Sequence, residues 1–287
     1  IVYINGLFTC LGNAKISILD RGFCYGDGLF ETIRVNQGKI NLLEQHINRL
    51  TNSLKQIFID LPMTRNELIK AVQETLDRNK YKNAIIRLAI TRGNTHSNIQ
   101  IDSNMAPTVV INIYPFTPPK KAFYKKGIKI KLFKERANLI NGIPNRLKTS
   151  NYLSNILIKQ NSDINNFMEG IVVDPDFGVT EGTTSNIFLV KNGLLKTPPI
   201  SPFVLPGITR QIVLDIAKNH KIPFLEDSIT TDELFNADEV FLTNSGIEII
   251  PVIQIDSQFI ANKKPGVLTI FFHEEFLKCV EANLNPC

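Results

Sequence analysis

One lysine, Lys148, stands where it could act as a nucleophile. The segment before it, 127–132, alternates apolar and charged residues as a strand does, and the segment 153–160 carries apolar residues at helical spacing. Ser150 or Asn151 could cap that helix. A lysine held at such a junction against an apolar wall can lose its proton near neutrality and attack a carbonyl to form a Schiff base. A solvated surface lysine is the simpler alternative, so other residues must support the chemistry.

Three further places offer donors for an anion. Arg49 is a charged fork beside an apolar helical stripe, Gly207-Ile208-Thr209 opens a predicted helix with free N–H groups, and Asn244-Ser245-Gly246 ends a predicted strand. Each has a simpler interpretation: a surface arginine, a capped helix and a turn. Together with the lysine, and with Glu181 in a Gly/Thr/Ser stretch, they fit pyridoxal phosphate. That cofactor needs a lysine for its aldehyde, a cradle for its phosphate and an acid for its ring nitrogen.

The composition is that of a globular chain of enzyme size. With 287 residues and 43% hydrophobic content, it can bury a large core and form two domains. Its 32 basic and 27 acidic residues are scattered, which favours small anionic ligands and argues against a nucleic-acid partner. Cysteines 10, 24, 279 and 287 and the isolated histidines lack metal-type spacing, so we expect reduced thiols in a cytoplasmic protein and no metal site. Without a leader or a run of ~20 apolar residues, no membrane association is expected.

The first part of the chain alternates strand-like and helix-like patterns. Strands are predicted at 2–4, 7–8, 16–19, 29–35, 84–91 and 108–114, and helices at 43–57 and 64–79. Asn5-Gly6 supplies the turn of a hairpin between the first two strands. The stretch 20–28, with three glycines, is expected to be a compact loop. It lacks the Lys-Ser/Thr ending of a P-loop and no βαβ pattern surrounds it, so we reject nucleotide binding at this stretch. The order of the predicted strands and helices indicates an α+β unit.

A proline-rich and then lysine-rich stretch beginning at Pro115 is the best linker in the sequence. We therefore predict a small N-terminal domain at 1–115, a linker at 116–127 and a larger C-terminal, cofactor-binding domain at 128–287. The second domain should contain strands at 127–132, 171–173, in the later part of 181–190 and at 239–246, and helices beginning near 153 and 205.

Six motifs, in this order along the chain, resemble those of the class IV aminotransferases. They are Tyr25-Gly-Asp-Gly-Leu-Phe-Glu31, His46-Ile-Asn-Arg-Leu50, Leu147-Lys-Thr-Ser-Asn-Tyr152, Glu181-Gly-Thr-Thr-Ser-Asn-Ile-Phe188, Leu205-Pro-Gly-Ile-Thr-Arg210 and Thr243-Asn-Ser245. The family comprises the fold type IV pyridoxal-phosphate enzymes, including branched-chain and D-amino acid transaminases and aminodeoxychorismate lyase. The resemblance implies an α+β fold with a small N-terminal α/β sandwich domain and a larger C-terminal β-barrel-like domain.

The resemblance also implies roles for particular residues. Lys148 would be the Schiff-base lysine and the proton shuttle, and Glu181 would pair with the pyridine nitrogen. The phosphate would be held by Arg49, Ser245 and, largely through backbone N–H groups, Ile208 and Thr209. In this family the site lies between the two domains and a homodimer completes it.

On the substrate side, the resemblance places Tyr25 and Glu31 near the cofactor. D-amino acid enzymes of Bacillus type carry an Arg-x-His pair shortly after a Thr-Arg-Gly motif. This chain has the motif, with Arg92 in it, but continues with Asn-Thr-His-Ser-Asn-Ile at 94–99, which argues against the D-specific alternative. Arg87 and Arg92 are then the candidate partners for a substrate carboxylate.

Two reactions fit this constellation. The first hypothesis is a transaminase that moves an amino group between a branched-chain or D-amino acid and a 2-oxo acid. The second is a lyase that releases pyruvate and 4-aminobenzoate from aminodeoxychorismate. We favour the transaminase because Phe30 and Ile33 could form an apolar wall for an aliphatic side chain. A catalytically silent binding protein is disfavoured because Lys148 and Glu181 are both present.

Overall fold

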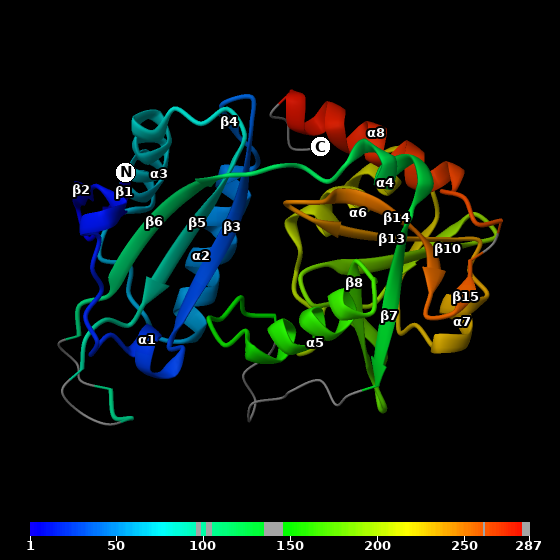
Figure 1. The fold of residues 1–287 in the computed structure, drawn as a ribbon, viewed down its shortest axis with the longest axis horizontal. Coiled ribbons are helices and arrows are strands. Elements are labelled where there is room, and N and C mark those ends of the chain that lie inside the picture. The colour runs from blue at the N-terminus through cyan, green and yellow to red at the C-terminus, as the bar shows by residue number, and fades with distance from the viewer. Residues whose placement is uncertain (96–98, 102–104, 135–145, 261, 283–287) are drawn as a thin grey trace. The chain divides into compact units, whose positions relative to one another are not determined.

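The computed structural model describes residues 1–95, 99–101, 105–134, 146–260 and 262–282. Within them the chain forms two compact units (Figure 1). The first unit is Ile1–Thr117 with Leu147–Asn151, and the second is Pro118–Arg146 with Tyr152–Cys287. The first unit therefore includes a short segment from much later in the chain. That segment contains Lys148, which the sequence analysis had placed in the second domain.

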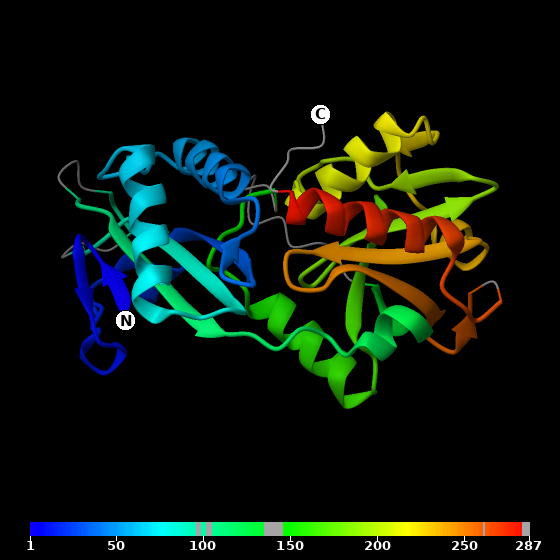
Figure 2. The same cartoon turned by 90° about the horizontal axis from the view of Figure 1, so that it is seen from above.

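The first unit is built on a six-stranded antiparallel sheet of order β2-β1-β6-β5-β3-β4. The strands are β1 (Val2–Ile4), β2 (Leu7–Thr9), β3 (Gly28–Asn36), β4 (Lys39–Ile40), β5 (Ala84–Thr91) and β6 (Thr108–Pro115). Helices α2 (Leu43–Gln56) and α3 (Arg65–Asn79) cover one face of it (Figure 2). This is the predicted arrangement of helices packed on strands, and the predicted hairpin turn is present, with Asn5 at φ 47° and Gly6 at φ 93°.

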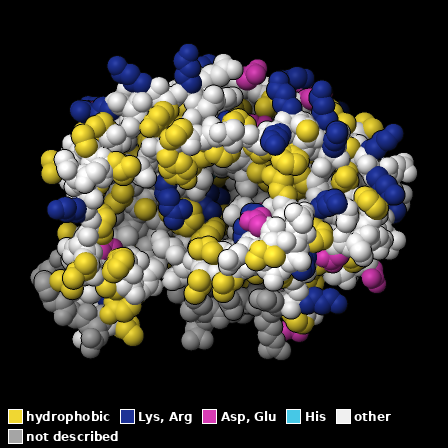
Figure 3. Space-filling model, viewed as in Figure 1, with side chains coloured by type: hydrophobic (Ala, Val, Ile, Leu, Met, Phe, Trp, Pro, Cys, Tyr) yellow, Lys and Arg dark blue, Asp and Glu magenta, His cyan; other side chains and the backbone are white. Residues whose placement is uncertain are grey.

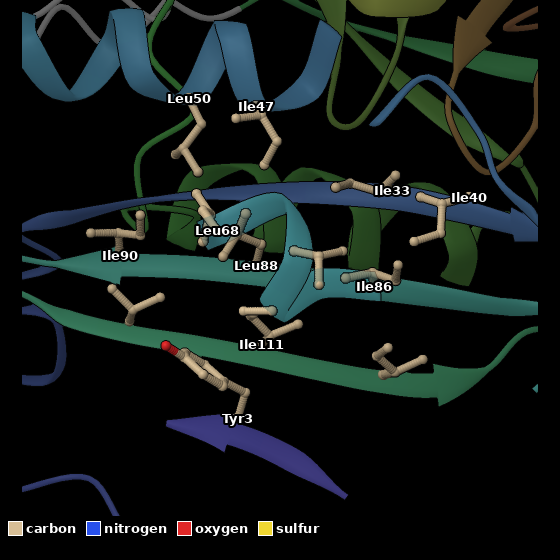
Figure 4. Packing of buried hydrophobic residues seen from close by; sticks show 14 of the residues in the cluster. Tyr3, Ile33, Ile40, Ile47, Leu50, Leu68, Ile86, Leu88, Ile90 and Ile111 are labelled. Carbon is tan, nitrogen blue, oxygen red and sulfur yellow. The ribbon is translucent and has the colours of Figure 1, made fainter. Parts of the chain in front are cut away.

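The core of the first unit lies between this sheet and its two helices (Figure 4). Strand residues of one face, such as Ile33 and Leu88, meet the stripe Ile47 and Leu50 of α2. Their burial removes apolar surface from water and supplies most of the packing energy. Helix α3 begins with a capping box between Thr64 and Glu67, which satisfies donors of its first turn.

Two local predictions for the first unit are wrong. Residues 16–19 form no strand, and Ile16 and Ile18 are exposed, because no neighbouring strand pairs with them. The glycine-rich stretch does not remain a loop: α1 (Arg21–Tyr25) forms there, after a short 3₁₀ helix at Leu11–Asn13. The side chain of Asp20 accepts a hydrogen bond from the N–H of Gly22, and Gly26 at φ 68° ends the helix, so caps outweigh the low helix propensity of glycine.

The second unit contains a nine-stranded mixed sheet of order β12-β11-β10-β13-β14-β7-β8-β9, with β15 beside β14. Its strands are β7 (Ile128–Lys134), β8 (Glu169–Asp174), β9 (Gly178–Gly182), β10 (Asn186–Lys191), β11 (Leu194–Thr197), β12 (Phe224–Glu226), β13 (Glu239–Asn244), β14 (Glu248–Ile255) and β15 (Gln258–Phe259). Its helices are α4 (Lys121–Lys126), α5 (Leu153–Ile164), α6 (Ile208–Asn219), α7 (Thr231–Phe235) and α8 (Val267–Glu281). Strand β9 also contacts β10, so the sheet curls, and the predicted α+β class is confirmed.

Three details of the second unit differ from the sequence analysis. Helix α4 lies inside the stretch 116–127 that was predicted as a linker, for which no helix was expected. Helix α5 begins after Tyr152, which provides no side-chain cap, so neither Ser150 nor Asn151 is its N-cap. The apolar stripe expected to bury α5 is instead exposed at Leu153 and Ile156, and the helix packs on β8 through residues such as Ile158.

Among the described residues, no helix combines the length and the apolar character needed to cross a membrane. Nor do the described histidine, cysteine, aspartate and glutamate side chains gather in any group of three or more that could hold a metal ion. The visible face carries its Lys and Arg side chains singly or in small groups (Figure 3), in keeping with the scattered charge of the sequence.

Candidate active site

Lys148 is held against the edge of strand β3 in the first unit. The N–H of Phe30 donates to the carbonyl of Lys148 over 2.9 Å, and the N–H of Ser150 donates to the carbonyl of Gly28 over 3.0 Å. Thr149 forms a bridge with Leu29 between these bonds. The backbone of the lysine is therefore fixed by β-type pairing across a large sequence separation, and its Nζ lies 4.6 Å from the centroid of the Phe30 ring.

Behind β3, on the side of α2, lies a buried charged cluster of Glu31, His46 and Arg49. Arg49 donates from Nε to Glu31 Oε1 over 2.8 Å and from Nη2 to Glu31 Oε2 over 2.6 Å. His46 Nδ1 lies 2.7 Å from the same Oε2. The spacing of three residues places His46 and Arg49 on one face of the helix, where both reach the same carboxylate. Arg49 therefore reaches inward from α2 to this carboxylate.

The electrostatics of this cluster follow from its burial and its charges. Burial alone would raise the pKa of Glu31, but Arg49 and then His46 hold it at about 2, so the carboxylate is ionised near neutral pH. Burial lowers the pKa of His46 below its ordinary 6.5, against the opposing effect of Glu31. A neutral imidazole that donates to Glu31 carries its proton on Nδ1. Glu31 thus serves as the partner of Arg49 inside the unit, whereas the sequence analysis had assigned it to the substrate.

The opposite face of β3 carries Phe30, whose ring lies against two cations. The guanidinium carbon of Arg87 is 3.6 Å from the ring centroid, in addition to the contact with Lys148. Arg87 stands on β5 directly across from Thr32, and Phe30 stands across from Ala89. Arg87 and Phe30 are therefore diagonal neighbours on one face of the sheet.

Of the two other predicted substrate residues, Arg92 has partners for each guanidinium nitrogen. It donates to the Asp27 carboxylate from Nε and Nη2, and to the carbonyls of Ile57 and Phe58 from Nη2 and Nη1. These bonds tie loops of the first unit together. Tyr25 is 47% exposed, and its ring lies beneath Arg21 at 5.1 Å.

In the second unit, Glu181 lies in strand β9 and not in a loop. Its Oε2 accepts a hydrogen bond from the N–H of Leu205 over 2.8 Å and from Asn186 Nδ2 over 3.2 Å. Asn186 also donates to the carbonyl of Leu205. The carboxylate is thus oriented by the segment that leads into helix α6.

The remaining predicted phosphate residues occupy two element ends of the second unit. Helix α6 begins at Ile208 after Gly207, which has no side chain to cap the first-turn N–H groups of Ile208 and Thr209. Ser245 follows β13 in a turn whose Asn244 side chain accepts from the N–H groups of residues 246 and 247, each over 2.7 Å. The structure therefore groups Arg49 and Lys148 in the first unit and the other four cofactor residues in the second.

The structure also contains a buried carboxylate that the sequence analysis did not single out. Glu169 is 4% exposed and accepts hydrogen bonds from the hydroxyls of Thr183, Thr184 and Ser185. Thr184 in turn accepts a bond from Asn244, through its carbonyl over 3.1 Å. Through Thr184, Glu169 is linked both to the turn after Glu181 and to the turn that holds Ser245. In the sequence, only the three successive hydroxyl residues 183–185 could have indicated that a buried carboxylate lies nearby.

Two expectations about the substrate wall can be compared with the structure. Ile33 is fully buried in the core beneath α2, so the prediction that it lines an apolar wall is wrong. Phe30 is on the other face, beneath Arg87 and Lys148.

His46 appeared in the sequence analysis only within a motif, although its spacing from Arg49 places both on one helical face. The stretch that replaces the Arg-x-His pair includes residues 96–98, which lie outside the described residues.

The donor set has the chemistry that pyridoxal phosphate requires. An amine is present for the aldehyde, in Lys148, and an oriented carboxylate for the ring nitrogen, in Glu181. A guanidinium, a helix start without a side-chain cap and a turn hydroxyl suit a phosphate dianion. The residues of each unit therefore fit their part of this cofactor.

Sequence comparison gives the family. The family described as amino-transferase class IV matches residues 28–255. A protein of Methanocaldococcus jannaschii described as a branched-chain-amino-acid aminotransferase is 38% identical over 275 residues, which cover 96% of this chain and 94% of that protein. The D-alanine aminotransferase of Bacillus licheniformis is 34% identical, with 93% of each chain covered.

Solved structures give the same fold. The branched-chain amino acid aminotransferase of Escherichia coli superposes with a TM-score of 0.93 at 26% identity, covering 99% of this chain and 95% of that one. A branched-chain amino acid aminotransferase solved with pyridoxamine 5'-phosphate has a TM-score of 0.92 at 28% identity, covering 98% of this chain and 94% of that one. A 4-amino-4-deoxychorismate lyase structure from Legionella pneumophila, at 24% identity and a TM-score of 0.84 over 94% of this chain and 96% of that one, shares the fold.

Proposed function

The chain belongs to the class IV aminotransferases, which use pyridoxal phosphate, and from this premise we propose that it transfers the amino group of a branched-chain amino acid to a 2-oxo acid. The observation that carries the proposal is the 38% identity, across 96% of the chain, to a relative described as a branched-chain-amino-acid aminotransferase. D-amino acids are the second candidate donors, because a relative at 34% identity is described as a D-alanine aminotransferase. The missing Arg-x-His pair favours the branched-chain donor.

In the proposed mechanism, Lys148 is the catalytic residue. Pyridoxal phosphate, when bound, supplies an electron sink that stabilises negative charge at the substrate α-carbon. The Nζ of Lys148 removes the proton from that carbon and later returns a proton during transfer. Backbone pairing with β3 holds the lysine in place, so its amine works from a fixed position.

The other proposed cofactor residues bind and orient. The Glu181 carboxylate, oriented by Leu205 and Asn186, is the proposed partner of the ring nitrogen. Arg49 and Ser245, with the N–H groups of Ile208 and Thr209, are the proposed phosphate donors. These are charged, hydroxyl and helix-start donors, the three kinds that bind phosphate best.

On the substrate side, Arg87 and Arg92 are the proposed partners of the carboxylate. The guanidinium carbon of Arg87 lies 3.6 Å from the ring centroid of Phe30, and Arg92 also donates to Asp27 and to two carbonyls. Tyr25 is a further candidate contact because its side chain is 47% exposed. An arginine suits a carboxylate because its planar fork can donate two parallel hydrogen bonds.

A single-turnover panel tests the proposed reaction. L- and D-isomers of branched-chain amino acids and of alanine are mixed one at a time with the cofactor-loaded enzyme, and the absorbance of the cofactor is followed. We expect the L-branched donors to give the fastest change and an added 2-oxo acid to reverse it. Pyruvate release from aminodeoxychorismate is measured in parallel; pyruvate release without any amino-acid half-reaction would overturn the transaminase in favour of the lyase.

We also propose that the chain acts as a homodimer. Exposed apolar side chains on α5, at Leu153, Ile156, Leu157 and Ile164, support an apolar contact surface. Analytical ultracentrifugation of the loaded enzyme should give twice the mass of the chain. Replacing Ile156 and Leu157 together by Asp should shift the protein toward the monomer, and an unchanged dimer would exclude this face.

A cytoplasmic location completes the proposal. It is supported by the sparse cysteines: those at 10, 24 and 279 are free thiols, as expected in a reducing compartment. Fractionation of cells that express the native protein, with an antibody against it, should recover it in the cytosolic fraction.

A further inference from the structure

Helix α6 contains a buried cation, Arg210, in its first turn. The side chain is 1% exposed, and an arginine is seldom buried to this degree unless it is paired. Its Nη2 donates to the carbonyl of Pro198 over 3.0 Å and to Glu226 Oε2 over 2.6 Å. Pro198 directly follows strand β11, and Glu226 ends strand β12, which pairs with β11 in parallel. The guanidinium therefore ties the start of α6 to the ends of two neighbouring strands.

The location of this cation is unfavourable for the helix taken alone. The N–H groups at the start of a helix give it a partial positive charge there, so cations are stabilising at its other end. Arg210 is the third residue of α6, and helical side chains lean toward the N-terminus. Its buried Nε has no hydrogen-bond partner among the described residues, and its partner Glu226 is 40% exposed, where water screens the carboxylate. An anion bound at the first turn would offset this concentration of positive charge.

The start of α6 is also held from a second side. The N–H of Leu205 donates to Glu181, and Asn186 donates to the carbonyl of Leu205. Gly207 packs against Asn186 so closely that an added Cβ would overlap the side-chain oxygen of Asn186. The start of the helix is thus fixed at two points, by Glu181 and Asn186 before its first residue and by Arg210 within its first turn.

We propose that Arg210 is a positioning residue for the phosphate of the cofactor, because its buried guanidinium fixes the first-turn N–H groups of α6. The proposal rests on the proposed function, in which Ile208 and Thr209 donate to that phosphate. Backbone donors bind a phosphate strongly only when they converge on it, so the place of the helix start decides their contribution. A purely structural role would instead make Arg210 equally important for every ligand of the site, with or without a phosphate.

A pair of ligands that differ only in the phosphate separates these explanations. Pyridoxamine phosphate and pyridoxamine both lack the aldehyde that reacts with a lysine, so the ratio of their dissociation constants reports the phosphate contacts. The ratio is measured by calorimetry in phosphate-free buffer on the full-length protein freed of cofactor. In Arg210→Met, which removes the charge and keeps an unbranched side chain, we expect the preference for the phosphorylated ligand to fall by about three- to thirtyfold. An equal loss of affinity for both ligands would overturn the proposal.

A second variant decides the question if circular dichroism shows that Arg210→Met does not fold. Arg210→Lys keeps a cation, but its amine ends one bond short of the position of Nη2. The contacts with Pro198 and Glu226 can then be kept only if the helix start moves. The preference for pyridoxamine phosphate should therefore still fall, by at least about twofold. A native preference in Arg210→Lys would overturn the proposal.

A matched control uses the start of another helix in the second unit. The carboxylate of Glu239 accepts hydrogen bonds from the N–H groups of Leu268 and Thr269, over 3.0 and 2.7 Å, in the first turn of α8. Glu239→Gln weakens this helix start, which has no part in the proposed phosphate contacts. The variant should lower the stability of the protein and leave the ratio of the two dissociation constants unchanged. A fall in the ratio as large as that of Arg210→Met would overturn the assignment to Arg210.

Arg49→Ala separates this inference from the function on which it rests. This variant removes a proposed phosphate donor of the first unit, so it should lower the preference for pyridoxamine phosphate whatever the role of Arg210. If Arg49→Ala lowers the preference and Arg210→Met and Arg210→Lys do not, the inference fails alone. If the native protein binds the two ligands equally well, the phosphate assignment of the proposed function fails, and the inference fails with it.

Discussion

The two units offer different kinds of group for the proposed cofactor contacts. In the first unit the groups are charged side chains: Lys148 against β3, and Arg49 paired with the buried Glu31. In the second unit, apart from Glu181, they are backbone N–H groups and a hydroxyl at element ends. The charge of Arg49 is oriented by a buried partner of opposite charge, whereas backbone donors are oriented by the helix or turn that contains them.

This difference predicts how each unit responds to substitution. A buried ion pair that loses one partner leaves an unpaired charge, which is strongly destabilising. A helix start keeps its N–H groups whatever side chain follows. Substitutions of the proposed cofactor residues in the first unit should therefore lower both activity and stability. In the second unit, the main effect should be a loss of activity when Glu181 is substituted. The following predictions test that contrast, beginning with the largest expected effect.

Lys148→Ala should abolish turnover, by more than about a thousandfold, because it removes the nucleophilic amine and the proton carrier together. The fold should be retained, since Lys148 is bound to β3 through its backbone. Activity and circular dichroism are compared with those of Lys125→Ala, an exposed lysine of α4. Borohydride reduction of the native protein should attach the cofactor to Lys148; attachment to another lysine would disprove the assignment.

Glu181→Gln should reduce the rate by about 10²-fold, because a carboxylate beside a developing charge contributes a few kcal/mol to the barrier. Cofactor affinity should fall less than the rate, since the amide keeps the shape. The rate constant and the cofactor dissociation constant are measured side by side, with Asp238→Asn, a surface partner of Lys191, as the control. A rate within about twofold of the wild type would show that Glu181 only joins β9 to the start of α6.

Acid should destabilise the protein through the Glu31 cluster. The folded-state pKa of Glu31 is about 2 against an ordinary 4.5, so its stabilisation is complete above about pH 4.5 and is lost as the pH falls toward 2. The difference corresponds to about 3 kcal/mol. The lowered pKa of His46 acts in the same direction, because below its ordinary 6.5 the unfolded chain takes up the proton first. Urea unfolding at a series of pH values measures this loss.

Glu31→Gln is the variant that tests this origin. It should be less stable at neutral pH, because Arg49 loses its charged partner, and its stability should change less between pH 4.5 and 2. Glu274→Gln, which alters an exposed carboxylate of α8 in the second unit, should leave the acid slope nearly as in the wild type. An acid slope unchanged by Glu31→Gln would place the acid sensitivity elsewhere.

Ser245→Ala should give the smallest effect, a weakening of cofactor binding by about tenfold, since a single hydrogen bond to a charged group contributes about 1.5 kcal/mol or somewhat more. The turn should persist because the Asn244 side chain holds it. Cofactor affinity is measured by fluorescence titration. A loss as large as that of Arg49→Ala, measured in parallel, would contradict the contrast between the two units.

Much of the fold could be predicted from the sequence because its signals are local. The stripe at Ile47, Leu50 and Leu54 and the Asn5-Gly6 turn each act within a few residues, and the structure contains both elements. The motifs around Lys148 and Glu181 likewise indicated the family and its cofactor before any geometry was known. Local patterns gave a wrong prediction where strand formation depends on a neighbouring strand. Residues 16–19 have a strand-like composition, but no strand of the sheet pairs with them.

Only the tertiary structure decided what the polar residues contact. Lys148 belongs to the first unit because β3 pairs with it across 118 positions of the chain, counted from Phe30, and no local pattern encodes such pairing. Glu31 and Phe30 are adjacent in sequence, yet one lies against the helices and the other beneath Arg87, because successive strand residues face opposite sides. The sequence indicated the family and its cofactor through residue types and motifs. The register of β3 and β5 determined which side chains of the first unit lie next to one another, because pairing between distant strands is not encoded locally.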